Sequence, residues 1–592
     1  MAFTFSNAQI ADLFEEITAA LIVQNDDRFR IRAYENAVSI FRQLQEPIEY
    51  YWQNKLLGTI TGIGTIFARK IDELFTTGKV AEFDAIRQSL PAGMFGLLPV
   101  EGIGPKNAFK LANIFKLADR ETAPAKLLES AKNGQIRGLE GFGEKSEAQL
   151  IDNITRYLLA GTVTRIPLYR ADQIVTEIGA YLGACPAIQT FSPLGSHRRR
   201  KETVGDIDIG ITTQQPKVVS DYVALIPKIS KIVAKGDGMV RIIYGEGIDV
   251  DFKIVDPGEW GSLLQHFTGS KAHNVALREM AVTRKMSMSE HGMKIKGAWQ
   301  RFTQEDKFYQ SLGLDHIPPE LRENLGEIEA AKNHSLPNLV TLADIKGDLH
   351  THTNYGWVNS HDAGLSSVDE LADTAVALGY EYLGVGDHNP SISTYNVDEI
   401  IKQIQKRSRF IEQIKNSYEK RVKKSTIKLF NALEIDIRSD GALAVPDAGI
   451  NLLDYAVVSI HSSFKQTAEQ MTERIIKGLS HPKAKILGHP TGRLIGKRDP
   501  IAANWDSIFG FCVTNGKAIE INASPDRLDL TDILVKKAIL LGVKLVIDTD
   551  AHHHSTLFGM QSGIDVARRG WATKADIINT WDAAKLTQWL IK

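Results

Sequence analysis

Two aspartates with one residue between them, Asp206 and Asp208, follow a run of basic residues (198–201) in the segment GSHRRRKETVGDIDIG. Residues i and i+2 of a β-strand face the same side, so the two carboxylates converge while the apolar residues beside them face the core. Convergent carboxylates repel each other unless cations lie between them. The pattern therefore predicts a site for divalent metal ions, and the basic run predicts an anionic ligand that carries phosphate.

A third acidic residue on a neighbouring strand would complete this site, and the segment GIDVDFKIV offers Asp249 and Asp251 on one strand face. Spacing alone leaves both open. Three carboxylates that hold two divalent cations about 3.5–4 Å apart support in-line displacement at phosphorus. Ser196 and Arg199 are then placed to bind the phosphates. A loop with a chance pair of aspartates is the alternative, which the Gly-Ser start and the third acidic strand disfavour.

The C-terminal half of the chain repeatedly places an imidazole or a carboxylate at the end of a segment that resembles a strand. These residues are His350, His352, His388, Glu434, His461, His489, Asp550 and His552. In a βα barrel, the carboxyl ends of the strands surround a single site. One histidine in such a place is usually structural, but the repetition predicts a hydrolytic site with several metal ions. Imidazole and carboxylate ligands suit Mn²⁺ or Zn²⁺.

Three Gly-x-Gly turns, each followed by a helical pattern, lie in the N-terminal part of the chain. They comprise Gly62 and Gly64, Gly102 and Gly104, and Gly141 and Gly143. Such a turn exposes backbone N–H groups at the positive end of a helix, where they can bind a phosphate without reading base sequence. One copy could equally be a plain helix connection, but three copies favour binding to the DNA backbone.

The overall composition sets few further limits. The chain has 592 residues, 43% of them hydrophobic and 24% charged, and a net charge of −1, which suggests several domains without favouring a particular partner. Cys185 and Cys512 are its two cysteines, so a disulfide framework and a cysteine-rich zinc site are excluded. No signal peptide and no apolar run of about 18 residues is present, so we expect a cytoplasmic protein without a membrane span.

The order of elements predicts the fold class. Helical periodicity covers residues 1 to about 160, alternating strand patterns begin near 166, and short strands alternate with helices from about 345. The last pattern is typical of a barrel or a layered α/β fold.

Gly195, Ser196, Arg199, the aspartate pair, Asp251 and the segment HFTGSKAHNVALR (266–278) resemble the palm and the nucleotide-selecting segment of family X DNA polymerases. The resemblance implies that Asp206, Asp208 and Asp251 hold two catalytic Mg²⁺ or Mn²⁺ ions, with Asp249 as the rival third ligand. It also implies a set of nucleotide contacts: Arg165, Gly195, Ser196, Arg199, His266, Phe267, Gly269, Asn274 and Arg278.

The implied contacts have different roles. Ser196, Arg199 and, more weakly, Arg165 match triphosphate contacts; Phe267 and Gly269 match residues under the sugar; Asn274 matches a contact to the minor-groove edge of the base; and Arg278 matches a residue beside the template. One departure concerns His266, where the family often has tyrosine, so the discrimination between deoxyribose and ribose stays open.

The segment GIGTIFARKIDELFTTGK (62–79) resembles the small lyase domain of the same family, and Lys70 matches its Schiff-base lysine. An amine nucleophile needs a depressed pKa, to which the neighbouring Arg69 could contribute by repulsion. A lysine that contacts phosphate is the alternative.

Residues from about 345 resemble the PHP (polymerase and histidinol phosphatase) domain, a distorted seven-fold βα barrel. The resemblance implies a centre of up to three ions with nine ligands, eight of which are the histidines and acids named above. For the ninth, His361 and Asp362 are both available, and we favour Asp362.

Together these resemblances imply a multidomain chain: helical helix-hairpin-helix domains (1–90 and 91–163), an α+β nucleotidyltransferase palm (164–256), a nucleotide-selecting domain (257–325), a linker (326–345) and a PHP barrel (346–592). They imply a monomeric enzyme of base-excision repair that adds deoxynucleotides from their triphosphates to gapped or nicked DNA with a 5′-phosphate at the gap. The PHP site would act as a Mn²⁺-dependent 3′-5′ exonuclease or a related phosphoesterase. Two alternatives remain: a phosphatase of a small phosphorylated metabolite that the front half tethers, and a scaffold that binds DNA ends.

Overall fold

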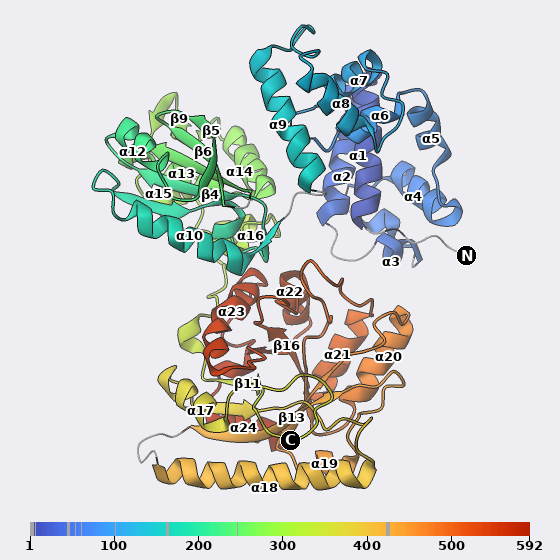
Figure 1. Cartoon of the computed structure of the whole chain (residues 1–592), viewed down its shortest axis with the longest axis vertical. Helices are drawn as coiled ribbons and strands as arrows, with labels where there is room; N and C mark the ends of the chain where they lie inside the picture. The colour runs from blue at the N-terminus through green and yellow to red at the C-terminus, as the bar shows by residue number, and fades with distance from the viewer. Residues whose placement is uncertain are drawn as a thin grey trace. The chain divides into compact units, whose positions relative to one another are not determined.

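The computed structural model describes residues 5, 7–43, 48–53, 55–60, 62–100, 102–160, 165–245, 247–421 and 427–591. The chain forms two compact units, residues 1–164 and 165–592 (Figure 1). The expected fold class is confirmed: the first unit is helical, and the second contains an α+β region followed by a barrel of seven parallel strands.

The first unit is built from helices alone within its described ranges. They are α1 (Asn7–Val23), α2 (Arg28–Gln43), α3 (Ile48–Gln53), α4 (Thr65–Thr77), α5 (Ala81–Gln88), α6 (Ala92–Leu97), α7 (Pro105–Ile114), α8 (Ala123–Lys132) and α9 (Glu144–Ala160). Helix α1 forms the centre because Ile10, Phe14, Ile17 and Leu21 recur at helical spacing and are all buried. A second core involves α6 to α9, so the unit has two apolar centres.

A five-stranded sheet begins the second unit. The elements of this region are β1 (Ile166–Pro167), α10 (Leu168–Leu182), β2 (Thr190–Pro193), α11 (Gly195–Arg198), β3 (Thr203–Val204), β4 (Ile207–Thr212), α12 (Pro216–Val223), β5 (Ile229–Lys235), β6 (Met239–Tyr244) and β7 (Ile248–Val255). Strands β1 and β3 pair in a separate two-stranded sheet. The sheet order is β2-β4-β7-β6-β5, and only β4 and β7 pair in parallel. Ile207, Ile209 and Ile211 of β4 pack with α10 and α12. Asp208 therefore lies on the opposite face, where Gly210 packs against Leu263.

The sheet is followed by a smaller mixed region. It comprises α13 (Trp260–Thr268), α14 (Lys271–Thr283), β8 (Ser287–Ser289), β9 (Gly292–Ile295), β10 (Ala298–Gln300), α15 (Glu305–Ser311) and α16 (Glu327–Lys332). The Ser270 hydroxyl caps α14 by accepting a hydrogen bond from the His273 N–H. The stretch 326–345, expected to be a linker, contains α16, and Val340 at its end packs into the core of the barrel.

Seven parallel strands form the barrel. The elements are β11 (Gly347–Thr351), α17 (Val368–Ala377), β12 (Tyr382–Val385), α18 (Val397–Arg421), β13 (Lys428–Asp436), α19 (Asp447–Ile450), β14 (Tyr455–Ser459), α20 (Ala468–Leu479), β15 (Ala484–Leu487), α21 (Trp505–Asn515), β16 (Ala518–Asn522), α22 (Asp532–Leu540), β17 (Lys544–Asp548), α23 (Met560–Arg569) and α24 (Ala583–Ile591). The strands follow one another in chain order, and a parallel bridge from Thr351 to Ala551 brings the two edges together.

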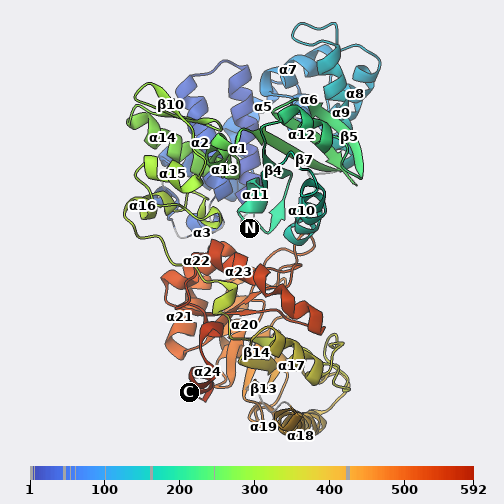
Figure 2. The ribbon, with the colours of Figure 1, turned by 90° about the vertical axis from the view of Figure 1, so that its left-hand side faces the viewer.

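The barrel interior is filled by side chains at one end. Leu349, Tyr382, Phe430 and Tyr455 form a buried cluster, which Leu586 of α24 completes. Figure 2 shows α22 and α23 on the opposite side of the barrel from α18 and α19, as Figure 1 does. Because all strands run in parallel, their carboxyl ends meet at the other end of the barrel, where polar residues can gather.

Candidate active sites

The first candidate site lies on the parallel strands β4 and β7. Asp208 on β4 is the register partner of Asp251 on β7, and Asp206 directly precedes β4. Burial and the negative charge of Asp206 raise the pKa of Asp208 to about 7. Asp251 keeps a buried Oδ1 atom without a hydrogen bond from any described residue. Carboxylates that are this desolvated and this close together fit a site for divalent cations.

The two acidic residues of β7 have different surroundings. Asp249 accepts hydrogen bonds from Nε and Nη2 of Arg241, at 3.2 and 3.1 Å. The Oδ2 atom of Asp251 lies 3.1 Å from Nζ of Lys253, and Asp251 is one of the charges that act on Asp208. The structure thus brings Asp251, rather than Asp249, next to the aspartate pair.

A glycine is required where the basic segment approaches the aspartates. Gly195 has a φ of +57°, and a Cβ atom there would lie 2.6 Å from Oδ2 of Asp208. The turn leads directly into α11, so the backbone of Gly195 and Ser196 stays close to the carboxylates. The sequence pattern of glycine and serine before the basic run is explained by this close approach.

A cavity of about 690 Å³ opens beside the aspartates. Its lining includes the predicted metal ligands Asp206 and Asp208 and most of the predicted nucleotide contacts: Arg165, Gly195, Ser196, Arg199, His266, Phe267, Gly269 and Asn274. Lys201 and Lys271, which the sequence analysis did not single out as site residues, also line it. Arg278 is exposed on α14 and lies outside the described lining.

The four basic residues of the run (198–201) have different roles, although Arg199 and Lys201 both lie near Glu323. Arg198 pairs with Glu305 at 2.7 Å, and Arg200 pairs with Asp172 at 2.6 Å. Both are therefore structural cations. Of the arginines in the run, Arg199 lines the cavity, where its Nη1 donates to the carbonyl of Thr268 and its Nε donates to Glu323 at 3.0 Å. Arg198 and Arg200 thus hold the loop in place, whereas Arg199 and Lys201 line the cavity.

Helix α13 and the start of α14 form the opposite wall. The Nδ2 atom of Asn274 donates to the carbonyl of His266 at 2.7 Å, and its Oδ1 accepts from Gln265 at 2.8 Å. Gly269 has a φ of +66°, and a Cβ atom there would lie 3.1 Å from Nη1 of Arg199. Burial lowers the pKa of His266, so its ring is neutral at pH 7.

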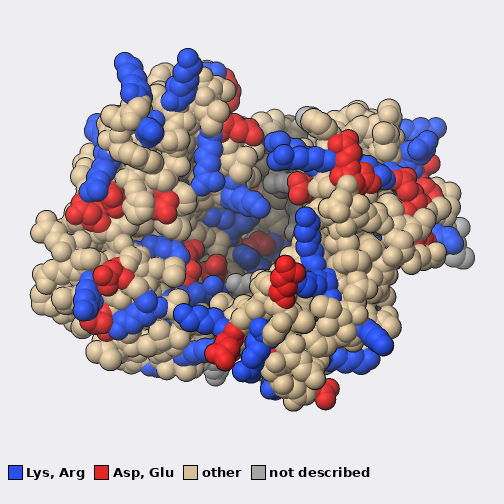
Figure 3. All heavy atoms as spheres, turned by 90° about the horizontal axis from the view of Figure 1, so that it is seen from above, with Lys and Arg blue, Asp and Glu red and all other residues tan. Residues whose placement is uncertain are grey.

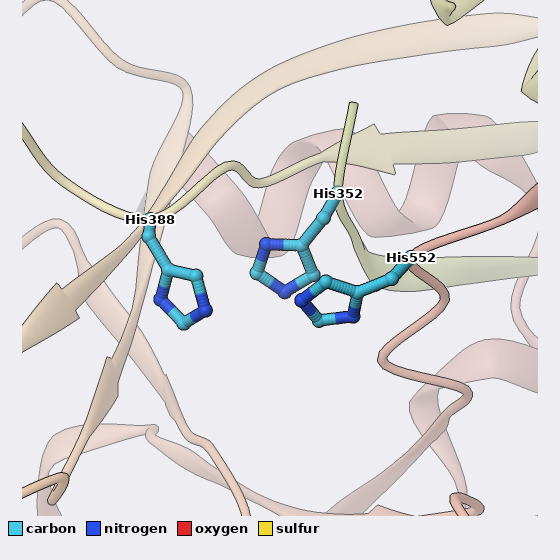
Figure 4. A group of neighbouring side chains, drawn as sticks. All are labelled: His352, His388 and His552. Carbon is cyan, nitrogen blue, oxygen red and sulfur yellow. The ribbon is translucent and has the colours of Figure 1, made fainter. Parts of the chain in front are cut away.

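The second candidate site lies at the carboxyl ends of the barrel strands. His350 lies on β11 and Glu434 on β13, whereas the other predicted ligands follow their strands: His352, His388, His461, His489, Asp550 and His552. Figure 4 shows the rings of His352, His388 and His552 close together. Most of these residues form overlapping groups whose ligand atoms lie within 4.8 Å of one another, and His489 adjoins them through Glu434.

Glu434 is the centre of these groups. Its carboxylate lies 3.3 Å from Nε2 of His350, 3.0 Å from Nδ1 of His388 and 2.8 Å from Nε2 of His489. Burial opposes ionisation of Glu434, but the charges of the surrounding histidines hold its pKa well below the usual range. A buried carboxylate among several imidazoles is the donor set of a centre with more than one metal ion.

The imidazoles themselves also fit metal ligation. Burial lowers the pKa of His352 to about 4 and that of His489 to about 3, so both rings are neutral. Nε2 of His350 and Nε2 of His552 are buried without a hydrogen bond from the described residues. Nδ1 of His352 and Nδ1 of His489 are buried in the same way, so these two neutral rings keep a nitrogen available for a cation.

The structure distinguishes the two residues that were open for the ninth position. Asp362 lies 3.4 Å from Nε2 of His388 and 3.4 Å from Nε2 of His552. His361 instead contacts Asp436 at 3.0 Å, which also lies 2.7 Å from Nδ1 of His461. Asp362 thus approaches two of the rings drawn in Figure 4, whereas His361, Asp436 and His461 form another group that could hold a metal ion.

Two acids near the second site were missed by sequence reasoning. Glu520 on β16 is completely buried and accepts from Nδ1 of His350 at 2.7 Å. Such a carboxylate fixes the ring orientation of a ligand. Its signal was an acidic residue in the middle of the otherwise mostly apolar strand AIEIN, and the signal for Asp436 was its i+2 spacing from Glu434.

The glycine turns of the helical unit have a common geometry. Gly62, Gly102 and Gly141 have φ values of +89°, +83° and +85°, and each turn is followed by α4, α7 or α9. A helix N-terminus with open space around the second glycine can receive a phosphate. The third turn differs, because the exposed Glu144 begins α9 and adds a negative charge.

Lys70 lines a second cavity of about 620 Å³ in this unit, together with Arg30, Tyr34 and Glu82. Its side chain is 5% exposed, and its ammonium group is ion-paired with Glu82. The hydrogen bond from Lys70 lowers the pKa of Glu82. The sequence had suggested an effect of Arg69, but the structure shows an acidic partner instead.

Charge is mixed over the face drawn in Figure 3, where Lys and Arg side chains alternate with Asp and Glu. This agrees with the net charge of −1 and implies that contacts to an anionic polymer are local. Within the described parts of the chain, no helix has the length and apolar character needed to span a membrane.

Comparisons with known proteins agree with these sites. Residues 5–80 match a helix-hairpin-helix domain, residues 263–323 match the DNA polymerase beta thumb, and residues 348–524 match the PHP domain. The chain is 31% identical to the DNA polymerase/3′-5′ exonuclease PolX of Bacillus subtilis (strain 168) over 575 residues, 96% of each chain. It is 25% identical to DNA polymerase lambda of Rattus norvegicus over 358 residues, 54% of this chain and 56% of that protein.

Proposed function

Because the chain belongs to the family X DNA polymerases that carry a PHP domain, we propose that its aspartate site adds deoxynucleotides to DNA and its histidine site removes them. The observation that carries this proposal is the pairing of Asp208 with Asp251 beside a cavity lined by Ser196 and Arg199. The templated addition of deoxynucleotides would fill short gaps in damaged DNA.

In the polymerase site, Asp206, Asp208 and Asp251 would hold two divalent cations, Mg²⁺ or Mn²⁺. When bound, these ions supply Lewis acidity to the primer hydroxyl and to the triphosphate. Arg199, with Ser196, binds the triphosphate oxygens and neutralises their charge. Arg165 contributes more weakly, since two of its nitrogens already donate to Thr203.

The nucleotide itself lies against α13 and α14 in this proposal. Phe267 and Gly269 support the sugar, and Asn274 contacts the base edge from a side chain that two hydrogen bonds hold in place. Such preorganisation reduces the entropy lost when the nucleotide binds. Arg278, exposed on the same helix, is placed to contact the template strand rather than the triphosphate.

In the PHP site, Glu434 and the residues around it would hold up to three Mn²⁺ or Zn²⁺ ions. His350, His352 and Asp550 would hold one ion; His461 and His489 a second; and Asp362, His388 and His552 a third. When bound, these ions supply an activated water and stabilise the charge on the phosphoryl oxygens. Glu520 would keep the ring of His350 oriented. The reaction would be 3′-5′ exonuclease cleavage or a related phosphoester hydrolysis.

The remaining parts of the chain would bring the DNA to these sites. The helix N-termini after Gly64 and Gly104 would bind backbone phosphates on gapped or nicked DNA, and the third turn would contribute less because of Glu144. Lys70 would lie next to the 5′-phosphate at the gap, with lyase activity as a further possibility to test. We propose that the chain acts as a monomer in the cytoplasm.

The test uses a duplex with a one-nucleotide gap, labelled at the 5′ end of the upstream strand, with Mn²⁺ and the complementary deoxynucleotide. Primers should grow by one nucleotide with wild type and His350→Ala, and shorten with Asp206→Ala. If the wild-type protein neither extends nor shortens the primer while it releases phosphate from small phosphomonoesters, the metabolite-phosphatase alternative replaces this proposal.

A further inference from the structure

The loop that carries Arg199 is held by the PHP domain as well as by the polymerase region. Arg569, the last residue of α23, donates from Nη1 to the backbone carbonyl of Arg199 at 2.8 Å. The same Nη1 atom lies 3.2 Å from Oε1 of Glu323. This carboxylate oxygen also accepts from Nε of Arg199 at 3.0 Å. Arg569 thus contacts the backbone of Arg199 directly and its side chain through Glu323.

These contacts are shielded from water. The side chain of Arg569 is 4% exposed and that of Glu323 is 16% exposed. The Nη2 atom of Arg569 donates to Asp532, the first residue of α22. Charge-assisted hydrogen bonds in such surroundings are stronger than those on the surface, because solvent screens them less. The chain of groups therefore fixes the guanidinium of Arg199 at the edge of the cavity.

Helix α23 is close in the chain to the second site. His552, a predicted metal ligand, lies shortly before the turn His554–Gly559, and α23 follows that turn directly. One short segment therefore joins the histidine site to the contact with the loop of the polymerase site. Asp565, on the same helix, accepts from Nε of Arg200 at 2.7 Å, so α23 contacts two successive residues of the basic run.

We propose that Arg569 and Glu323 are positioning residues for triphosphate binding, so that the PHP domain contributes to the polymerase site through α23. The inference rests on the proposed role of Arg199 as a triphosphate ligand. Loss of Arg569 would remove a support of the Arg199 backbone and of Glu323, which holds the guanidinium together with the Thr268 carbonyl, so the affinity for the nucleotide would fall. The geometry of the aspartates would not change, because none of these contacts involves them.

The neighbouring residue provides a matched control. Arg568 also lies on α23 and donates to Glu320 at 2.8 Å and to the carbonyl of Val340 at 3.1 Å. It therefore links the PHP domain to the same segment as Arg569 does, but it does not contact Arg199 or Glu323. A general loosening of the domain contact would affect both variants alike.

The experiment measures KM for the deoxynucleotide, kcat for extension and the exonuclease rate of the full-length protein on gapped DNA. Arg569→Ala and Glu323→Gln should each raise KM about tenfold, with kcat changed by less than about twofold. Arg569→Lys keeps the charge without the planar fork and should raise KM by only about threefold. Arg568→Ala should leave KM unchanged, and all four variants should keep the wild-type exonuclease rate.

The outcomes separate this inference from the proposed function. No extension by the wild-type protein would refute the proposed function. An unchanged KM in Arg199→Ala would refute the role of Arg199. If Arg199→Ala raises KM but Arg569→Ala and Glu323→Gln leave it unchanged or lower it, the positioning role alone is wrong. Equal effects of Arg568→Ala and Arg569→Ala would also overturn it, because the contact would then serve domain docking only.

Discussion

Asp208 and Asp251 lie opposite each other on two parallel strands, in register across β4 and β7. The sequence offered two acids of one strand, Asp249 and Asp251, as the third carboxylate of the site. The register between β4 and β7 favours Asp251. Arg241 lies 3.1 Å from Asp249 and 3.6 Å from Asp251, so its ion pair is the closer one with Asp249. The parallel pairing thus converts an ambiguous strand pattern into a site with one preferred third carboxylate.

Replacement of each acid in turn tests that selection. Asp251→Asn should slow primer extension by roughly a hundredfold to a thousandfold, because a lost ligand weakens the stabilisation of charge in the transition state. Asp249→Asn should keep extension within about threefold of wild type, since that carboxylate serves the ion pair with Arg241. Single-turnover extension on gapped DNA measures both. A larger loss in Asp249→Asn than in Asp251→Asn would contradict the assignment.

The central place of Glu434 predicts a loss of bound metal. Glu434→Gln should lower the Mn²⁺ content of the purified protein and reduce exonuclease cleavage by at least about a hundredfold. Extension by the polymerase site should remain. Elemental analysis measures the metal content, and cleavage of a labelled single strand measures the exonuclease activity. Glu412 is exposed on α18, so Glu412→Gln serves as the matched control. Unchanged metal content in Glu434→Gln would show that the histidine site holds its ions without the carboxylate of Glu434.

The ion pair between Lys70 and Glu82 predicts that Lys70 forms a Schiff base only slowly. Glu82 holds the Lys70 side chain in an ion pair, so Glu82→Gln should free the amine to reach a substrate and raise Schiff-base trapping by about threefold to tenfold. The measurement is borohydride trapping of a DNA end that carries a 5′-deoxyribose phosphate. Lys70→Ala should abolish trapping, and Lys79→Ala should not change it. Equal trapping by wild type and Lys70→Ala would assign the activity to another amine.

The pair of Arg200 and Asp172 predicts a pH dependence of stability. Burial opposes ionisation of Asp172, but hydrogen bonds from His197 and Arg200 lower its pKa to about 2. A carboxyl whose pKa is lower in the folded state contributes stability above its unfolded value near 3.9, and this contribution is lost as the pH falls towards 2. Since its side chain is 39% exposed, we expect Asp172→Asn to cost about 1 kcal/mol at neutral pH.

Urea unfolding of wild type and Asp172→Asn at pH 7 and pH 3 provides the measurement. The difference in the free energy of unfolding should shrink at the lower pH. Asp221→Asn is the control, because Asp221 forms an exposed pair with Lys235 at 2.6 Å and its loss should have little effect at either pH. A difference that grows as the pH falls would have the wrong sign for this linkage.

Much of the fold was predictable because its signals are local. The spacing of Ile10, Phe14 and Ile17 marks α1, and the alternation in DIDIG marks a strand with one polar face. The repetition of strands and helices after residue 345 indicated the barrel. The stretch 326–345 was expected to be a linker, but it contains α16. This helix was not predicted because six residues without strong apolar periodicity give little helical signal.

The sequence by itself determined which residue types stand at the strand ends, because the period of a strand depends only on its own backbone. Tertiary structure alone decided the partners: Asp251 for Asp208, Asp362 for His388, Glu82 for Lys70 and Glu323 for Arg199. Each pair joins segments apart in the chain, and several acids were available to each group. Register between strands and packing between helices determine which of them lies within reach, and neither can be read from local spacing.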